Sequence, residues 1–403
     1  MLVGWDWAAE SHAVTVMNGM GEIVARWSLA HTEKEVTETI RRLGGYGDRA
    51  EVPVGIETPN GLIVERLLEA GHPVVPIHPN AFNAARPRWG ASRSKSDPGD
   101  SWRLADYLRT DGHRLPRLRP IDEVSRQLQL LSRTRDDHVK AKRAALNQLA
   151  ALLDAHWPGP KNLFTSLDRE IALEFLDRYP TPESVGRLGE ARMAAFLKRH
   201  SYSGRKPAAV LLARLKTPPR SPARVDPDIL TETVRAQVAL IRTLVNTIND
   251  LDRAMTAVAA THTKVELIAG LPRIGEGTNL AQILAEVAPI LDRAASLDQA
   301  CAEIGATPVT RASGTQHVVS FRWTVNTKAR KALAIFADNS RHQSAWAADL
   351  YQKARARGKR HPQAVRILMR AWLRVIWACW QSNTPYHPHH HGAEQKLAKQ
   401  NVA

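Results

Sequence analysis

The chain is poor in cysteine, with only Cys301 and Cys379 among 403 residues. So few thiols exclude a disulfide framework and fit a reducing cytoplasm. The opening segment MLVGWDWAAE lacks the basic start of a signal peptide. Long apolar runs are lacking too, because Arg370 and Arg374 interrupt the best candidate, residues 367–379, and it falls short of the ~20 residues that cross a bilayer. We therefore expect a cytoplasmic protein with no membrane partner.

Acidic residues are in deficit: 40 Asp and Glu face 56 Lys and Arg, which gives a net charge of +16. The charge is unevenly distributed. Residues 1–110 hold 12 basic and 14 acidic side chains, whereas residues 111–403 hold 44 basic and 26 acidic side chains. A basic remainder of net charge +18 favours a polyanionic partner, of which nucleic acid is the commonest. At 43% hydrophobic residues, the chain can bury a core, and its length predicts two or three domains.

The first 80 residues alternate between strand and helix patterns. Strands are predicted at residues 2–8, 12–18, 22–29, 52–57 and 73–78, and helices at 33–43 and 61–70. Three antiparallel strands followed by alternating helix and strand are typical of an α/β fold of the RNase H-like type. We predict such a domain over residues 1–115.

The remainder is predicted to be helical. Residues 116–262 contain two long helices, 121–157 and 228–261, around a small insert at 158–227. Apolar residues of the second helix recur every three or four positions, which indicates a coiled coil or a helical hairpin, within one chain or between two. Residues 263–381 form a mainly α domain, and the His-containing tail, 382–403, is predicted to be disordered.

Four carboxylates stand out near the N-terminus. Asp6 lies between Trp5 and Trp7: if the tryptophans face the core, Asp6 faces the other way. Glu57 ends a predicted strand. Asp97 and Asp100 lie three apart at a helix start, where they could equally serve as an N-cap and a first-turn acid. Together, however, clustered carboxylates require cations, and Mg²⁺ prefers oxygen ligands. Two such ions can drive phosphoryl transfer.

The blocks VGWDWA, VGIETPNG and KSDPGDSWRLADYL resemble those of the DEDD-type insertion-sequence transposases. These proteins, related to Piv-type DNA invertases, join a RuvC-like domain to a C-terminal serine-bearing transposase domain. The resemblance covers nearly the whole chain, with Ser96 where a threonine is usual. It implies that Asp6, Glu57, Asp97 and Asp100 bind Mg²⁺ or Mn²⁺ and are catalytic.

The segment TPVTRASGTQHVVSFRWTVNTKARKAL is similar to the serine-glycine block of the same family. The resemblance implies that Ser313 attacks the scissile phosphate, although a lone Ser-Gly is also an ordinary turn. Basic residues around it are candidates for phosphate binding: Arg311, His317, Arg322, Lys328, Arg330 and Lys331. Residues 271–278 resemble a helix-hairpin-helix turn in which Arg273 replaces a glycine, so that a tight hairpin is in doubt and a positive charge is added. Arg273 is therefore a candidate nucleic-acid contact, and a helix-packing turn without DNA contact is the open alternative.

The aromatic–basic helix at 361–380 carries Trp372, Trp377 and Trp380, whose uneven spacing predicts packing and not base stacking. As partners, the resemblance implies double-stranded DNA at the element ends and target, a structured guide RNA and a homo-oligomer, dimer or tetramer, acting at the bacterial nucleoid. Two alternatives stay open at this point. One is an RNase H-like nuclease or junction resolvase without serine catalysis, and the other is a non-catalytic nucleic-acid-binding scaffold.

Overall fold

The computed structural model describes residues 1–90, 97–219, 225–275, 277–314 and 316–392. The chain divides into two compact units, Met1–Asp122 and Glu123–Ala403, each with its own hydrophobic core. None of the described helices is long and apolar enough to cross a membrane.

The first unit is built on a five-stranded sheet of order β3-β2-β1-β4-β5. Its strands are β1 (Leu2–Trp7), β2 (Ser11–Met17), β3 (Ile23–Ala30), β4 (Val54–Ile56) and β5 (Val74–Pro76). The first three are antiparallel, whereas β4 pairs in parallel with both β1 and β5. The five strands predicted from the sequence are confirmed, with ends that differ by one or two residues.

Helices cover both faces of this sheet. α1 (Glu33–Leu43) and α2 (Leu62–Glu69) share a core with Val3 and Trp5 of β1. Because side chains alternate along a strand, Gly4 belongs to the opposite face, and there it meets α4 (Asp97–Asp111). The short helix α3 (Pro79–Ala85) precedes α4 in the chain, and Phe82 on α3 contributes to a second small core with Leu104 on α4.

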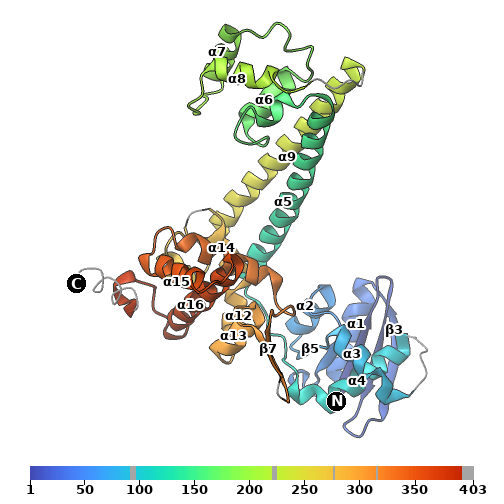
Figure 1. Cartoon of the computed structure of the whole chain (residues 1–403). Coiled ribbons are helices and arrows are strands. Elements are labelled where there is room, and N and C mark those ends of the chain that lie inside the picture. The colour runs from blue at the N-terminus through green and yellow to red at the C-terminus, as the bar shows by residue number, and fades with distance from the viewer. Residues whose placement is uncertain (91–96, 220–224, 276, 315, 393–403) are drawn as a thin grey trace. The chain divides into compact units, whose positions relative to one another are not determined.

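In the second unit, α5 (Glu123–His156) and α9 (Pro227–Ala259) form an antiparallel pair within one chain (Figure 1). Arg135 is ion-paired with Asp252, and the Ser125 hydroxyl lies 3.1 Å from Nε2 of His262. The heptad-like spacing thus packs α9 against α5 of the same chain. The insert between them is helical, as predicted, with α6 (Glu170–Arg178), α7 (Glu190–Arg199) and α8 (Ala208–Lys216) at the far end of the pair.

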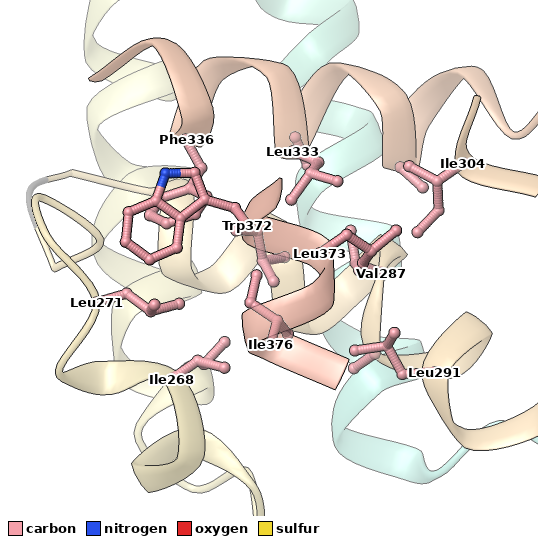
Figure 2. Close-up of a cluster of buried hydrophobic side chains, with 14 of the residues drawn as sticks. Ile268, Leu271, Val287, Leu291, Ile304, Leu333, Phe336, Trp372, Leu373 and Ile376 are labelled. Atoms are coloured by element: carbon pink, nitrogen blue, oxygen red, sulfur yellow. The ribbon is translucent and has the colours of Figure 1, made fainter. Parts of the chain in front are cut away.

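A bundle forms at the other end of the pair. It comprises α10 (Val265–Ala269), α11 (Asn279–Glu286), α12 (Ala288–Arg293), α13 (Leu297–Ile304), the hairpin β6 (Val309–Ser313) and β7 (Gln316–Ser320), α14 (Thr327–Ser340), α15 (Ala345–Ala356) and α16 (His361–Ser382). Figure 2 shows its core, in which Trp372 lies among aliphatic side chains. Trp372 donates from Nε1 to the Ser340 hydroxyl at 2.7 Å, and Trp380 is also buried. The prediction that these tryptophans pack is confirmed.

The helical pair and the bundle share one core, although the sequence suggested separate regions at 116–262 and 263–381. Leu128 of α5 and Met255 of α9 belong to the same cluster as the bundle residues. Polar contacts add to this junction, because Arg133 pairs with the buried Glu286 at 3.0 Å and Lys331 pairs with the buried Asp136 at 2.7 Å. A buried carboxylate needs such a partner, so these pairs favour one arrangement of the elements.

The prediction of a disordered tail is wrong as far as residue 392. Tyr386 is buried, its backbone N–H donates to the Leu267 carbonyl at 3.0 Å, and its ring contacts Trp372 edge-on. His391 also lies against Trp372. An aromatic anchor of this kind offsets the entropy of ordering a terminal segment, which composition alone does not reveal. The rest of the predicted tail, 393–403, lies outside the described residues.

Candidate active site

Two of the four predicted carboxylates lie at neighbouring strand ends. β1 and β4 are parallel, with Trp5 opposite Ile56, and the next residues along the two strands are Asp6 and Glu57. The carboxyl ends of parallel strands meet at one edge of a sheet, so the register places both acids there. On β1, Asp6 shares the face of Gly4, which is the face that α4 covers.

Of the two tryptophans that flank Asp6, only Trp5 packs in the core. Trp5 is fully buried among the residues under α1 and α2, but Trp7 is half exposed. Trp7 is the last residue of β1 and lies outside the core cluster. Alternation along a strand predicts which face of the sheet a residue belongs to, but it does not predict whether the helices on that face reach far enough to bury the residue. Asp6 is partly exposed between them.

The helix α4 lies unusually close to β1. A Cβ on Gly4 would come within 1.9 Å of the Ser101 carbonyl oxygen and 2.5 Å of the Ala105 nitrogen, so only glycine fits. The buried hydroxyls of Thr15, on β2, and Ser101 lie 2.8 Å apart and add a polar contact between the sheet and the first turns of α4. These contacts hold the helix that carries Asp97 and Asp100 against the strand that carries Asp6.

Asp100 is buried, with 4% of its surface exposed, and two arginines bind its carboxylate. Arg86 donates to Oδ2 at 3.0 Å and Arg103 donates to Oδ1 at 2.8 Å. Arg86 belongs to the turn after α3, and Arg103 lies one turn further along α4. These charge-assisted bonds compensate the burial of a charged group. Asp97 is the first residue of α4, and its side chain lies outside the described residues.

The structure therefore brings the acids into one region without assembling a metal cage from the side chains it describes. Among those side chains, no three histidines, cysteines or carboxylates form a group that could hold a metal ion. The donor chemistry nevertheless fits Mg²⁺ or Mn²⁺, because every candidate ligand is a carboxylate oxygen. The sequence missed the two arginines on Asp100. The spacing of Arg103 to Asp100 was a usable signal for one of them.

Ser313 ends β6 and is exposed at the turn of the β6–β7 hairpin. It pairs with Gln316, and Gly314 adopts a φ of +55°, in the left-handed region that glycine tolerates. The serine-glycine block is thus a tight turn that presents its hydroxyl on the surface. Thr315 lies outside the described residues, as do the side chains of Arg311 and His317.

The basic residues near the hairpin do not all have free charges. Lys331 is paired with Asp136, so its charge has a counter-ion at the junction between α5 and α14. Arg322 donates to the carbonyl oxygens of Thr307 and Pro308 at 3.4 Å, so part of its guanidinium braces the backbone before β6. Arg330 donates from Nη2 to the Arg322 carbonyl at 2.5 Å. Lys328 is half-buried at the start of α14.

The turn at residues 271–275 keeps the conformation expected of a glycine. Arg273 has a φ of +57°, and its backbone N–H donates to Oε1 of Gln343 at 2.6 Å. The replacement of glycine by arginine therefore does not open the turn, contrary to the doubt that the sequence raised. The turn borders a cavity of about 520 Å³ that Gln343, Ser344 and Tyr386 also line.

Comparison with known proteins shows the family of the chain. Residues 3–158 match the DEDD-type transposase profile, and residues 265–352 match the profile described as transposase IS116/IS110/IS902 family. A protein assigned as the mini-circle transposase for IS117 in Streptomyces coelicolor is 31% identical over 390 residues, which cover 94% of this chain and 93% of that protein. The 42 kDa protein of insertion element IS900 from Mycobacterium paratuberculosis is 26% identical over 96% of both chains. The chain belongs to the IS116/IS110/IS902 family of transposases.

Proposed function

We propose that this transposase cleaves and rejoins DNA by a metal-assisted reaction in which Ser313 is the nucleophile. Asp6, Glu57, Asp97 and Asp100 are the proposed ligands of Mg²⁺ or Mn²⁺. The observation that supports the proposal is the parallel register of β1 and β4, because Asp6 and Glu57 directly follow the paired residues Trp5 and Ile56. The helix that holds the other two acids, α4, lies against β1. The order of three antiparallel strands and two parallel ones supports an RNase H-like assignment of this unit.

The residues have separate roles in this mechanism. Bound divalent ions would neutralise the carboxylates and polarise the scissile phosphate. The Ser313 hydroxyl attacks phosphorus: a phosphorus–Oγ bond forms, the bond from phosphorus to the leaving strand oxygen breaks, the serine proton passes to a base, and the leaving oxygen is protonated. Rejoining is the reverse attack by a strand hydroxyl on the phosphoserine. The exposure of Ser313 at a hairpin turn gives a DNA phosphate access to it.

Asp100 forms ion pairs before any metal ion binds. Its carboxylate is bound by Arg86 and Arg103, so a metal ion would compete with two guanidinium groups for the same oxygens. An arginine released from Asp100 would remain close to the bound phosphate, where a bidentate contact with phosphate oxygens is favourable. The arginine pair thus supplies the counter-charge of the buried carboxylate in the absence of substrate and ion.

The proposed partners are double-stranded DNA at the element ends and target and a structured guide RNA. Residues 111–403 carry 44 basic and 26 acidic side chains, and this excess supports a polyanionic partner of either kind. A homo-oligomer is part of the same proposal, because exchange between two DNA sites requires more than one cleavage.

The decisive experiment looks for a covalent protein–DNA adduct that survives denaturation. We expect it with the unaltered protein in Mg²⁺ or Mn²⁺, and its loss in Ser313→Ala and in Asp6→Asn, because the first lacks the nucleophile and the second lacks a ligand. Ser320→Ala, at the far end of β7, is the matched control and should form the adduct. Excess chelator should abolish the adduct in every variant.

Each failure has a different meaning. Metal-dependent cleavage without an adduct, unchanged in Ser313→Ala, would assign the attack to water and favour a nuclease or resolvase. Cleavage that persists in chelator would exclude the metal site. DNA binding with no cleavage under any condition would leave only a scaffold.

A further inference from the structure

Beyond the acids and the serine, a cluster of aromatic and basic side chains lies where β7 leads into α14. Phe321 follows β7 directly, and two guanidinium groups lie over its ring. The guanidinium carbon of Arg330 is 4.6 Å from the ring centroid, and that of Arg366 is 4.8 Å from it. Arg330 comes from α14 and Arg366 from α16, so the fold brings together two arginines that are 36 positions apart in the sequence.

The two arginines lack a counter-charge within the described part of the chain. Neither forms an ion pair there, and the buried Nε of Arg330 has no hydrogen-bond partner. Partial burial lowers the pKa of both guanidinium groups, and the charge of Arg366 lowers the pKa of Arg330 further. Two cations of this kind on one ring are stabilised by the ring face, yet they still repel one another. An anion placed between them would relieve that repulsion.

The backbone nearby makes room for this arrangement. A Cβ on Gly305 would lie 2.6 Å from Nη2 and 2.7 Å from Nε of Arg330. Gly305 also ends α13 in the left-handed conformation, with a φ of +80°. Two features favour glycine at this position. Its left-handed backbone conformation is unfavourable for other residues, and a side chain would clash with the guanidinium group of Arg330.

An exposed indole completes the cluster. Trp323 is 80% exposed, and its ring lies 4.7 Å from that of Phe321 in an edge-to-face contact. A tryptophan so open to solvent contributes little to the core, unlike Trp372 in the same unit. Val318 and Val319, four and five residues earlier in the chain on β7, are also exposed. The surface thus offers a flat aromatic face next to paired cations.

We infer that Phe321, Trp323, Arg330 and Arg366 form a binding site for an unpaired nucleotide, in which the guanidinium groups bind a backbone phosphate and the Trp323 indole stacks on a base. A free phosphate would explain the arginines but not the exposed indole. In a duplex the base faces are already stacked, so an indole can stack only on an unpaired base. The site deepens the proposed function, since strand exchange requires DNA to open, but it does not depend on Ser313 chemistry.

The test measures binding of the full chain to fluorescent 12-nucleotide oligothymidylate, oligouridylate and a blunt DNA duplex, in chelator so that no cleavage occurs. Trp323→Ala should weaken single-strand binding by about tenfold, within the range known for aromatic–base stacking, and change duplex binding by less than about twofold. Trp323→Phe, which keeps an aromatic face, should restore most of the affinity. Circular dichroism and melting should stay unchanged, because Trp323 is exposed.

The arginines are tested against a matched control on the same helix. Arg366→Gln should weaken single-strand binding and reduce the slope of log affinity against log salt by about 0.7, the value for one phosphate contact. Arg370→Gln removes the same charge one turn away, where the side chain is exposed and reaches Asp298 at 3.5 Å, and should change neither quantity.

The two nucleic acids are distinguished by the same measurements. A Trp323 dependence with oligothymidylate, with oligouridylate or with both supports the site and identifies the strand it accepts. Equal affinity of Trp323→Ala and the unaltered protein for both single strands would overturn the site. So would an equal loss for single strands and duplex, because it would indicate a general charge or folding effect. The adduct experiment tests the Ser313 nucleophile independently of these binding measurements. A negative result for the nucleotide-binding site therefore leaves the proposed nucleophile untouched, and the reverse also holds.

Discussion

Arg273 shows how a single residue can keep a conformation that its type disfavours. A left-handed φ in a non-glycine residue costs on the order of 1 kcal/mol. Arg273 holds this conformation at +57° while its N–H is bonded to Gln343. The strain is offset locally by that hydrogen bond, and an arginine side chain is presented where glycine would offer only backbone.

Arg273→Gly should therefore leave the turn intact and leave the free energy of unfolding unchanged or raise it by up to about 1 kcal/mol. If the side chain contacts phosphate, duplex affinity should fall at the same time. Thermal unfolding and binding anisotropy measure the two effects. A large loss of stability would contradict our account of the strain.

Two buried histidines give the first unit a predicted pH dependence. Burial lowers the pKa of His72, whose Nδ1 lies 3.1 Å from the Val52 carbonyl, and burial with the neighbouring His31 lowers that of His12. Because the folded-state pKa lies below the unfolded value of about 6.5, the unfolded state binds more protons. Stability is therefore full above pH 6.5 and falls as the pH drops toward the folded-state pKa.

Hydrogen exchange in peptides covering β4 and β5, corrected for the intrinsic pH effect, should show more opening at pH 5.5 than at pH 7.5. His72→Gln should reduce this difference, since glutamine does not titrate. His361→Gln, which alters an exposed histidine of the second unit, should not reduce it. The same pH difference in the His72 variant would assign the effect to other groups.

At the scale of elements, the close contact of β1 and α4 decides where the proposed metal ligands lie. At Gly4 the two elements are so close that a methyl group would not fit between them. Thr15 on β2, the neighbouring strand, adds a contact between its hydroxyl and that of Ser101 on α4. The position of Asp100 relative to Asp6 thus depends on a glycine that bears no chemistry of its own.

Gly4→Ala should push α4 off the sheet and lower the free energy of unfolding by roughly 1–3 kcal/mol or more, because overpacking displaces backbone here. Metal-dependent cleavage should fall further than stability alone explains, since the ligands separate. Gly19→Ala, whose Cβ would meet nothing within 4 Å, is the matched control. Full activity and stability of Gly4→Ala would show that the helix can move without cost.

At the scale of the whole molecule, the charge follows the two units. Residues 1–122 hold 15 basic and 16 acidic side chains, whereas residues 123–403 hold 41 basic and 24 acidic side chains. The unit with the proposed metal ligands is nearly neutral, and the unit with Ser313 is strongly basic. Affinity for nucleic acid is therefore expected to come from the second unit, with the first contributing chemistry.

Each unit has its own core, so fragments 1–122 and 123–403 can be compared. Fragment 123–403 should bind duplex DNA with an affinity that falls steeply with salt, and fragment 1–122 should bind weakly. Titrations at several salt concentrations measure the two slopes. Similar affinities and slopes for both fragments would contradict the division of roles.

Local patterns were enough to predict the strands of the first unit, the two long helices and the mainly helical character of residues 263–381, because alternation and helical periodicity are properties of neighbouring residues. They did not predict the β6–β7 hairpin within residues 263–381. The sequence also placed Asp6 within the first strand and Glu57 at the end of the fourth. The pairing of Asp100 with Arg86, the glycine-like turn at Arg273 and the docking of Tyr386 were decided only by tertiary structure. Each depends on contacts between segments far apart in the chain, whose energies no local pattern encodes. The same holds for Arg330 and Arg366, which meet on Phe321 only because α14 and α16 pack together.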